Sequence, residues 1–189
     1  MSTPIKWLKS LDEALKEAKE KEKAVFLDFF NPGWIGCQQM DAVTYPNENV
    51  ATFIKEKFVP LRVAYDHPEL SKRFNVTWTP ALFILDEEGV IHHSAVGFLP
   101  PEEFIPFGLL GLAKVAFDKG RYDQALCFFD NVIDRYPESS AVPEAIYLKA
   151  VCLFKKTNDA SVLKKAYEEL RARFPQSEWA KRAYPYRLL

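Results

Sequence analysis

The strongest constraint on this chain is an apolar run of seven residues that leads directly into a turn with one cysteine. The run covers residues 24–30, and Asp28 is its only charged residue. A short, almost wholly apolar segment is typical of a buried strand. The residues that follow, Trp34-Ile35-Gly36-Cys37, open a region of helical character that ends near Val43. We therefore expect a buried strand, a turn and a helix, with Cys37 one turn into that helix.

Further strands and helices alternate on both sides of this turn. Ser10 and Glu13 form a capping-box pattern ahead of an apolar stripe at helical spacing. The segment Glu87-Glu88-Gly89 is a turn signal between two strand-like runs. The predicted elements are, in order, helix 11–21, strand 24–30, a helix to about 43, helix 47–58, strand 59–65, helix 68–74, strand 79–86, strand 90–96 and helix 102–118.

The rest of the chain has no strand pattern and contains an internal repeat. The segment Arg135-Tyr136-Pro137-Glu138-Ser139 is echoed 38 residues later by Arg173-Phe174-Pro175-Gln176-Ser177. The segment from Gly120 to Leu126 resembles the turn within a tetratricopeptide repeat, a class with a usual period of ~34 residues. Stacked helix pairs of this kind bury a shared core and leave a concave surface for partners. The predicted helices are 121–135, 140–156, 159–173 and 177–184.

The first part of the chain resembles a thioredoxin-like domain. Asp28-Phe29, followed by Trp34 and Cys37, fits that family's spacing Asp-Phe-(x)4-Cys-x-x-Cys without a gap. Thr79-Pro80 resembles the family's cis-proline loop, and Gly97 resembles the glycine after its last strand. The resemblance implies an α/β fold, with a central mixed sheet flanked by helices over residues 1–110. An all-α domain of tetratricopeptide-like helices is then expected over residues 111–189.

The redox cycle of that family needs two cysteines, whereas this turn has one. The first cysteine attacks a substrate disulfide, and the second resolves the mixed disulfide. Trp34 stands at the first position, so no disulfide can close within the turn. We therefore do not expect disulfide reductase activity of the dithiol type, and the sequence leaves open whether the chain is an enzyme at all.

Cys37 itself has two interpretations. As a monothiol site it would be the catalytic residue, with its thiolate stabilised in part by the helix dipole. The resemblance then implies that Asp28, which matches the buried acid of thioredoxins, acts as a base that helps to ionise the thiol. A buried carboxylate that stays charged would instead raise the pKa of a neighbouring thiol. In the other interpretation Cys37 is a small buried apolar side chain, the commonest state of a free cysteine.

Four residues beside the turn form a candidate peptide-binding site: Trp34, Trp78, Thr79 and Pro80. Trp34 either fills the former active-site cleft or stays exposed as a contact for partners, a role that tryptophan favours. The resemblance implies that the Thr79-Pro80 loop faces the cysteine turn and that Thr79 pairs with the backbone of a bound peptide, as a short added strand. Alternatively, Thr79-Pro80 is a rigid turn that serves the fold alone.

Composition and charge exclude several classes of function. The net charge is −1, with 25 Lys and Arg against 26 Asp and Glu, so we expect no nucleic-acid partner. Because no run approaches the ~18 apolar residues of a membrane span and no signal-peptide pattern occurs, we expect a cytoplasmic protein without membrane attachment. The spacing of Cys37, Cys127 and Cys152 does not indicate a disulfide framework. Cys127 and Cys152 are expected in helix cores, and neither a metal nor a cofactor is expected.

Three functional hypotheses follow. A thioredoxin-like domain that keeps only the second cysteine and precedes tetratricopeptide helices resembles the chaperedoxin type of cytoplasmic protein, although this chain has fewer repeats. That resemblance implies holding of unfolded clients, mixed disulfides through the lone cysteine and delivery to chaperones. The first hypothesis is a protein-binding or chaperone-like adaptor that takes proteins or peptides at the Trp34/Pro80 groove and on the repeat surface. The second is a monothiol redox protein that acts through Cys37 in cell redox homeostasis. The third is a structural subunit of a larger complex.

Overall fold

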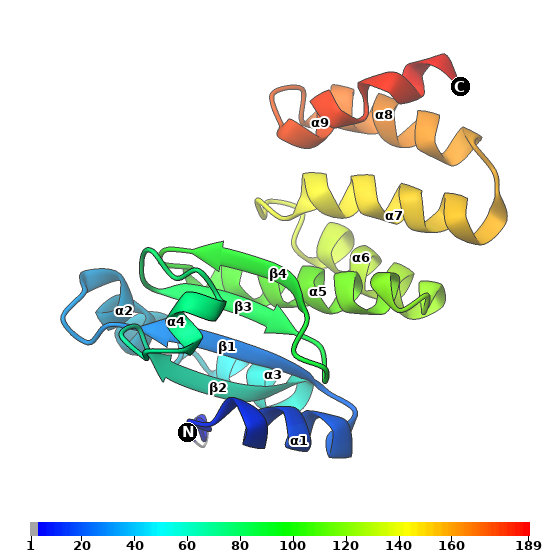
Figure 1. The fold of residues 1–189 in the computed structure, drawn as a ribbon. Helices are drawn as coiled ribbons and strands as arrows, with labels where there is room; N and C mark the ends of the chain where they lie inside the picture. The colour runs from blue at the N-terminus through cyan, green and yellow to red at the C-terminus, as the bar shows by residue number, and fades with distance from the viewer. Residues whose placement is uncertain (1–3) are drawn as a thin grey trace. The chain divides into compact units, whose positions relative to one another are not determined.

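The computed structural model of the protein describes residues 4–189. The chain divides into two compact units, the first ending at Ile105 and the second covering Pro106–Leu189. The first unit is a four-stranded sheet with helices on both faces, and the second is all-α (Figure 1). The predicted fold class is therefore confirmed. The division lies at residue 105, within a helix, whereas the sequence placed the domain boundary at residue 110.

The elements of the first unit follow the predicted order. The Ser10 hydroxyl accepts a hydrogen bond from the Glu13 N–H at 3.4 Å, as the capping-box pattern predicts. The helix that was expected to end near residue 43 changes at Met40 into a π-helical turn. The elements are α1 (Leu11–Lys21), β1 (Ala24–Phe30), α2 (Ile35–Gln39), the π-turn η1 (Met40–Thr44), α3 (Glu48–Lys57), β2 (Phe58–Ala64), α4 (Leu70–Arg73), β3 (Ala81–Leu85), β4 (Ile91–Val96) and the start of α5 (Pro101–Asp118).

The π-turn η1 adds one residue to the helix that follows the cysteine turn. The Tyr45 N–H donates to the Met40 carbonyl, five residues back, at 2.9 Å. The Thr44 hydroxyl donates to the Leu99 carbonyl at 2.6 Å, and the Leu99 N–H donates to the Met40 sulfur at 3.5 Å. These contacts tie η1 to the segment that precedes α5.

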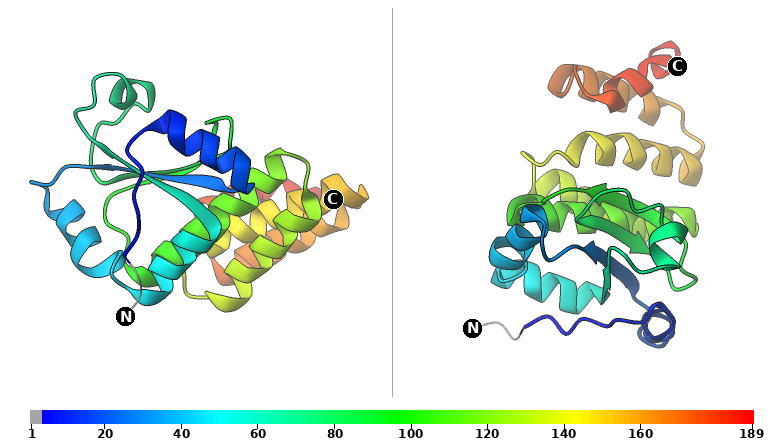
Figure 2. Two further views of the ribbon diagram at one scale, coloured as in Figure 1. Left: turned by 90° about the horizontal axis from the view of Figure 1, so that it is seen from below. Right: turned by 60° about the vertical axis from the view of Figure 1, so that its left-hand side comes forward.

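The sheet is mixed, with strand order β2-β1-β3-β4. The central strand β1 runs parallel to β2 and antiparallel to β3. Its register places Asp28 beside Arg62 on β2 and beside Leu82 on β3. Residues 24–29 of β1 are all buried. The apolar run therefore forms the centre of the sheet, between α1 on one face and α3 on the other (Figure 2).

Side chains of β1 alternate between two apolar cores, one on each face of the sheet. Leu27 and Phe29 belong to the core that α1 covers. On the opposite face the Phe26 ring lies 5.1 Å from the Phe104 ring and 6.1 Å from the Phe58 ring, measured between centroids. Burial of such a side chain contributes about 1.5–3 kcal/mol. Both cores therefore hold β1 rigidly, and with it the turn that begins at its end.

The second unit consists of antiparallel helices with the predicted repeat. The helix predicted over residues 177–184 ends at Arg182, and a 3₁₀ helix follows it from Tyr184 to Leu188. None of the helices within residues 4–189 has the length and apolar character needed to cross a membrane. After α5, the elements are α6 (Tyr122–Arg135), α7 (Val142–Thr157), α8 (Ser161–Arg173), α9 (Glu178–Arg182) and the 3₁₀ helix η2 (Tyr184–Leu188).

The two cysteines of the second unit differ in their surroundings. Cys152 is buried, as predicted, and its thiol donates to the Tyr122 carbonyl at 3.6 Å. Burial raises the pKa of this thiol to about 11. The prediction for Cys127 is wrong, because this residue is exposed. The buried face of α6 contains Ala125 and Phe129. Cys127 lies two positions from each of them and therefore points about 200° away around the helix.

Candidate functional site

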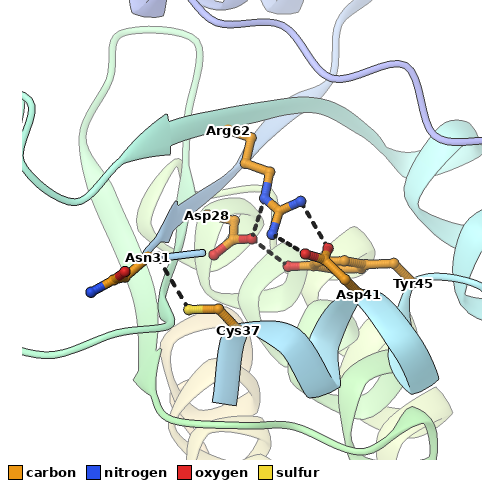
Figure 3. Close-up of polar contacts among 6 residues, drawn as sticks. All are labelled: Asp28, Asn31, Cys37, Asp41, Tyr45 and Arg62. Carbon is orange, nitrogen blue, oxygen red and sulfur yellow. Dashed lines mark hydrogen bonds and ion pairs between the residues drawn. The ribbon is translucent and has the colours of Figure 1, made fainter. Parts of the chain in front are cut away.

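The cysteine turn joins the end of β1 to α2 (Figure 3). Trp34 is the N-cap residue of α2 and has extended backbone geometry, with φ −101° and ψ 130°. Cys37 lies in the first turn of the helix and is 1% exposed. Its sulfur accepts a hydrogen bond from the Asn31 N–H at 3.3 Å. The turn therefore holds its only sulfur beneath the surface instead of presenting it to solvent.

The Thr79-Pro80 loop packs directly against this turn. The peptide bond between Thr79 and Pro80 is cis, and the Gly97 N–H donates to the Pro80 carbonyl at 2.8 Å. A Cβ atom on Gly36 would lie 3.0 Å from Pro80 Cδ and 3.8 Å from the Thr79 carbonyl oxygen. The loop and the turn thus face each other, and the missing side chain at Gly36 permits this close approach.

Replacing Gly36 with Ala is expected to lower the free energy of unfolding by about 1 kcal/mol. Overpacking costs typically ~1–3 kcal/mol, and the better helix propensity of Ala offsets up to about 1 kcal/mol of it. Urea denaturation followed by circular dichroism measures the change. Gly33→Ala is the matched control, because its Cβ would approach Asn31 Oδ1 only to 3.4 Å. Equal stability of Gly36→Ala and wild type would mean that the loop is free to move away from the turn.

Trp34 and Trp78 form an exposed aromatic pair. Their ring centroids lie 4.6 Å apart with the ring planes at 83°, an edge-to-face arrangement. Trp34 is 38% exposed and Trp78 is 55% exposed, so Trp34 does not serve as a core filler. The two rings border a pocket of ≈ 230 Å³, whose lining also includes Tyr65 and Thr79. Exposed aromatic side chains around a hollow are typical of a recognition surface.

Beneath this surface lies a buried polar network built on Asp28. The Tyr45 hydroxyl donates to Asp28 Oδ2 at 2.9 Å, and Arg62 Nε lies 3.1 Å from the same oxygen (Figure 3). The far end of the Arg62 guanidinium pairs with both oxygens of Asp41, at 2.8 and 3.1 Å. The guanidinium carbon also lies 4.3 Å from the centroid of the Phe30 ring, within cation–π distance. Arg62 thus links a buried carboxylate to an exposed one.

Burial dominates the protonation behaviour of this network. It raises the pKa of Asp28 to about 6, against the opposing effects of the Arg62 charge and the Tyr45 hydrogen bond. Burial and the adjacent Asp28 carboxylate also raise the pKa of Tyr45 well above its usual value. Asp28 therefore changes its charge near neutral pH, while Tyr45 keeps its proton and remains a hydrogen-bond donor.

The relation between Asp28 and Cys37 is indirect. Within residues 4–189, Asp28 Oδ1 is buried and has no hydrogen-bond partner. In Figure 3 this oxygen points away from Tyr45 and Arg62, to the side on which Cys37 is drawn. The hydrogen bonds and ion pairs of the described residues do not join Asp28 to Cys37. The role of Asp28 as a base for Cys37 therefore stays a prediction.

Sequence reasoning missed three members of the network: Tyr45, Arg62 and Asp41. Arg62 carried the one usable signal, because an arginine in a largely apolar strand needs a partner when its side chain is buried. The sequence around Tyr45 gave no signal that this residue contacts Asp28, since its position depends on the π-turn η1. In the part of the chain that the structure describes, no group of three His, Cys, Asp or Glu side chains is arranged to hold a metal ion.

Comparison with known proteins agrees with this division of the chain. Residues 11–108 match the family model of the thioredoxin-like domain, and residues 108–139 and 144–177 match that of the tetratricopeptide repeat. The thiol:disulfide interchange protein DsbD of Neisseria meningitidis is 30% identical over 100 residues. That match covers 51% of this chain but only 16% of the length of DsbD.

Solved structures show the same fold for the first unit. A thioredoxin from Thermus thermophilus superposes with a TM-score of 0.54 at 24% identity, over 63% of this chain and 96% of its own. A candidate disulphide-isomerase from Bacteroides thetaiotaomicron gives a TM-score of 0.52 at 26% identity, over 59% of this chain and 95% of its own. Because the thioredoxin-like match from residue 11 to residue 108 covers more than half of the sequence, the chain belongs to the thioredoxin-like domain family and carries tetratricopeptide repeats after that domain.

Proposed function

We propose that the thioredoxin-like domain is a protein-binding, chaperone-like adaptor that takes extended peptide segments without disulfide chemistry. The peptide would lie in the groove formed by Trp34, Trp78, Thr79 and Pro80. Tetratricopeptide repeats generally mediate protein–protein interactions, and in this proposal the repeat helices provide a second surface for partners. The proposal keeps the interpretation drawn from the sequence pattern, in which a lone second cysteine ahead of tetratricopeptide helices resembles the chaperedoxin type of protein.

The exposed Trp34–Trp78 pair beside the loop is the observation that carries this proposal. Within residues 4–189, the Thr79 N–H and C=O take part in none of the backbone hydrogen bonds between loops and turns. An extended peptide could pair with these two groups as a short added strand. The pocket of ≈ 230 Å³ beside them would then receive one side chain of that peptide. Affinity would thus come from the backbone of the peptide and from the two tryptophan rings.

The position of the sulfur favours binding over catalysis. Nucleophilic attack on a substrate disulfide requires an accessible thiolate, and Cys37 is 1% exposed. The other two cysteines, Cys127 and Cys152, belong to the second unit. The turn itself therefore has no partner sulfur with which to release a mixed disulfide.

Replacing Trp34 with Ala is expected to weaken peptide binding about thirtyfold, because loss of a tryptophan hot spot costs about 2 kcal/mol. Cys37→Ser is expected to leave the affinity within about twofold. The probe is reduced, carboxymethylated α-lactalbumin, which is unfolded and has no free thiol. Fluorescence anisotropy gives the affinity, and amide chemical shifts of Thr79 and Trp78 locate the contact.

Ile91→Ala is the matched control, since Ile91 is also an exposed apolar residue but lies at the other end of β4 from Gly97. Its binding should equal that of wild type. Equal binding by wild type and Trp34→Ala, or shifts confined to residues outside the groove, would contradict the proposal.

A monothiol redox protein is the second candidate, favoured by the hydrogen bond from the Asn31 N–H to the Cys37 sulfur. This contact fixes the position of the sulfur in the first turn of α2. The same set of variants separates the two functions when partners that keep free thiols are trapped without reductant. Partners lost only with Cys37→Ser would support the redox function, and partners lost only with Trp34→Ala would support the adaptor.

A further inference from the structure

Three cationic side chains surround a cavity in the second unit that no carboxylate lines. The cavity has a volume of ≈ 600 Å³ and lies between α8, α9 and η2, which are close neighbours in Figure 1. Arg171 of α8, Lys181 of α9 and Arg187 of η2 line it, together with the rings of Tyr167 and Tyr184. Its wall is therefore strongly positive although the whole chain has a net charge of −1.

These three cations lack the ion pairs that neighbouring cations make. On α8, Arg173 pairs with Glu169, and on α9, Arg182 pairs with Glu178. Among residues 4–189, no Asp or Glu pairs with Arg171, Lys181 or Arg187. No ion pair within residues 4–189 therefore offsets the positive charge of the cavity. The neighbouring arginines Arg173 and Arg182, by contrast, are paired with glutamates.

The two arginines are held in place by the tyrosines. The Arg187 guanidinium carbon lies 3.7 Å from the centroid of the Tyr184 ring, and its Nη1 donates to the Tyr184 carbonyl at 3.2 Å. Arg171 Nη1 donates to the Tyr167 hydroxyl at 3.5 Å, and the Tyr167 ring is buried. The two rings meet edge to face, with centroids 6.3 Å apart. These contacts restrict the two guanidinium groups, that of Arg187 more closely than that of Arg171, and restriction before binding lowers the entropic cost of binding.

The cavity continues along α8 as a groove. A neighbouring cavity of ≈ 390 Å³ shares Tyr167, Arg171 and Arg187 with the first and extends to Lys164 and Glu168. The Lys164 ammonium donates to the Leu189 carbonyl at 2.9 Å and is already engaged. Glu168 is the single carboxylate on the wall of this extension. A groove that runs through both cavities suits a linear ligand better than a compact one.

We propose that this groove binds an acidic peptide segment of a protein partner, whose carboxylates pair with Arg171, Lys181 and Arg187. Guanidinium groups bind carboxylates through two parallel hydrogen bonds, and such charge-assisted bonds are about twice as strong as neutral ones. The tyrosine rings would pack against the stems of the acidic side chains. This site is separate from the Trp34/Pro80 groove and does not depend on the function proposed for it.

Anisotropy of a fluorescein-labelled hexaglutamate peptide with the full chain tests the proposal. The double variant Arg171→Gln/Arg187→Gln should bind roughly tenfold more weakly or worse than wild type. The control Lys165→Gln/Arg173→Gln makes the same change in net charge on α8 outside the groove, and it should bind within about twofold of wild type. A hexaglutamine peptide should not bind.

Three results would overturn the proposal. They are no binding of hexaglutamate by wild type, equal weakening in both double variants, and displacement of the peptide by inorganic phosphate but not by acetate at equal ionic strength. The second would mean a general response to charge, and the third would mean a phosphate site. Amide shifts of Ala172 and Lys181 on titration with hexaglutamate give an independent measure of where the peptide lies.

Discussion

Replacing Arg62 with Met is expected to lower the free energy of unfolding by about 3 kcal/mol near pH 8.5. Methionine keeps an unbranched apolar side chain at this position, so the change removes the charge beside Asp28 together with the cation–π contact on Phe30. Without that charge, the buried Asp28 binds a proton instead of remaining ionised. Keeping it protonated costs about 1.4 kcal/mol for each pH unit above the wild-type pKa of about 6. Chemical denaturation at several pH values measures the loss, which should shrink as the pH falls to about 5.

Two further variants make this expectation specific. Asp41→Asn removes the exposed partner of Arg62 and should cost only about 0–1 kcal/mol, the usual range for an exposed pair. Asp28→Asn combined with Arg62→Met removes the buried carboxylate and should recover most of the stability near pH 8.5. A loss that is the same at pH 5 and pH 8.5 would show that Arg62 acts by packing and not by charge.

Replacing Asp28 alone with Asn is expected to stabilise the protein at neutral and alkaline pH. In the folded state the pKa of Asp28 is about 6, whereas in the unfolded chain it is about 3.9. Between these values the folded state binds more protons, so the stability of the wild type falls as the pH rises from about 4 to about 6. The difference of about two pKa units between the folded and unfolded states corresponds to about 3 kcal/mol of unfolding free energy. The wild type loses this stability as the pH rises, whereas the Asn variant keeps it.

Denaturation of wild type and Asp28→Asn between about pH 4 and pH 8 measures this effect directly. The gap in stability between the two proteins should open as the pH rises from about 4 to the folded-state pKa of about 6, and it should stay constant above about pH 7. Asp41→Asn serves as the control, because Asp41 is half-exposed and its loss should leave the pH profile nearly unchanged. A gap that is the same at every pH would contradict a raised pKa for Asp28.

The fold could be predicted from the sequence because local signals and the overall pattern agree. The apolar run of residues 24–30 became the central strand, and the spacing from Asp28 to Cys37 placed the turn at its end. The Thr79-Pro80 signal identified the loop that packs against this turn. For Trp34 the sequence offered both an exposed and a buried position. The structure shows it exposed, with its ring edge to face against Trp78, which lies 44 positions further along the sequence.

The buried network and the cationic groove show where sequence reasoning fails. An arginine at position 62 in an apolar strand indicates that a partner is needed, but only the register between β1 and β2 identifies that partner as Asp28. Arg171 and Arg187 belong to different helices and form no motif. Their common cavity results from the packing of η2 beside α8. Cys127 was misplaced for a simpler reason, because apolar neighbours in the sequence do not fix which face of a helix a residue takes.

The π-turn has a consequence for how relatives of this domain are compared. In a π-turn the hydrogen bond spans five residues instead of four, so the turn contains one extra residue. Deletion of that extra residue would rotate the side chains that follow it by about 100° around the helix axis. Tyr45 would then leave Asp28, although the helix itself would survive. We therefore expect relatives that lack one residue between positions 40 and 44 to lack the phenol donor to the buried acid. Such a gap in an alignment is a chemical marker and not merely a difference in loop length.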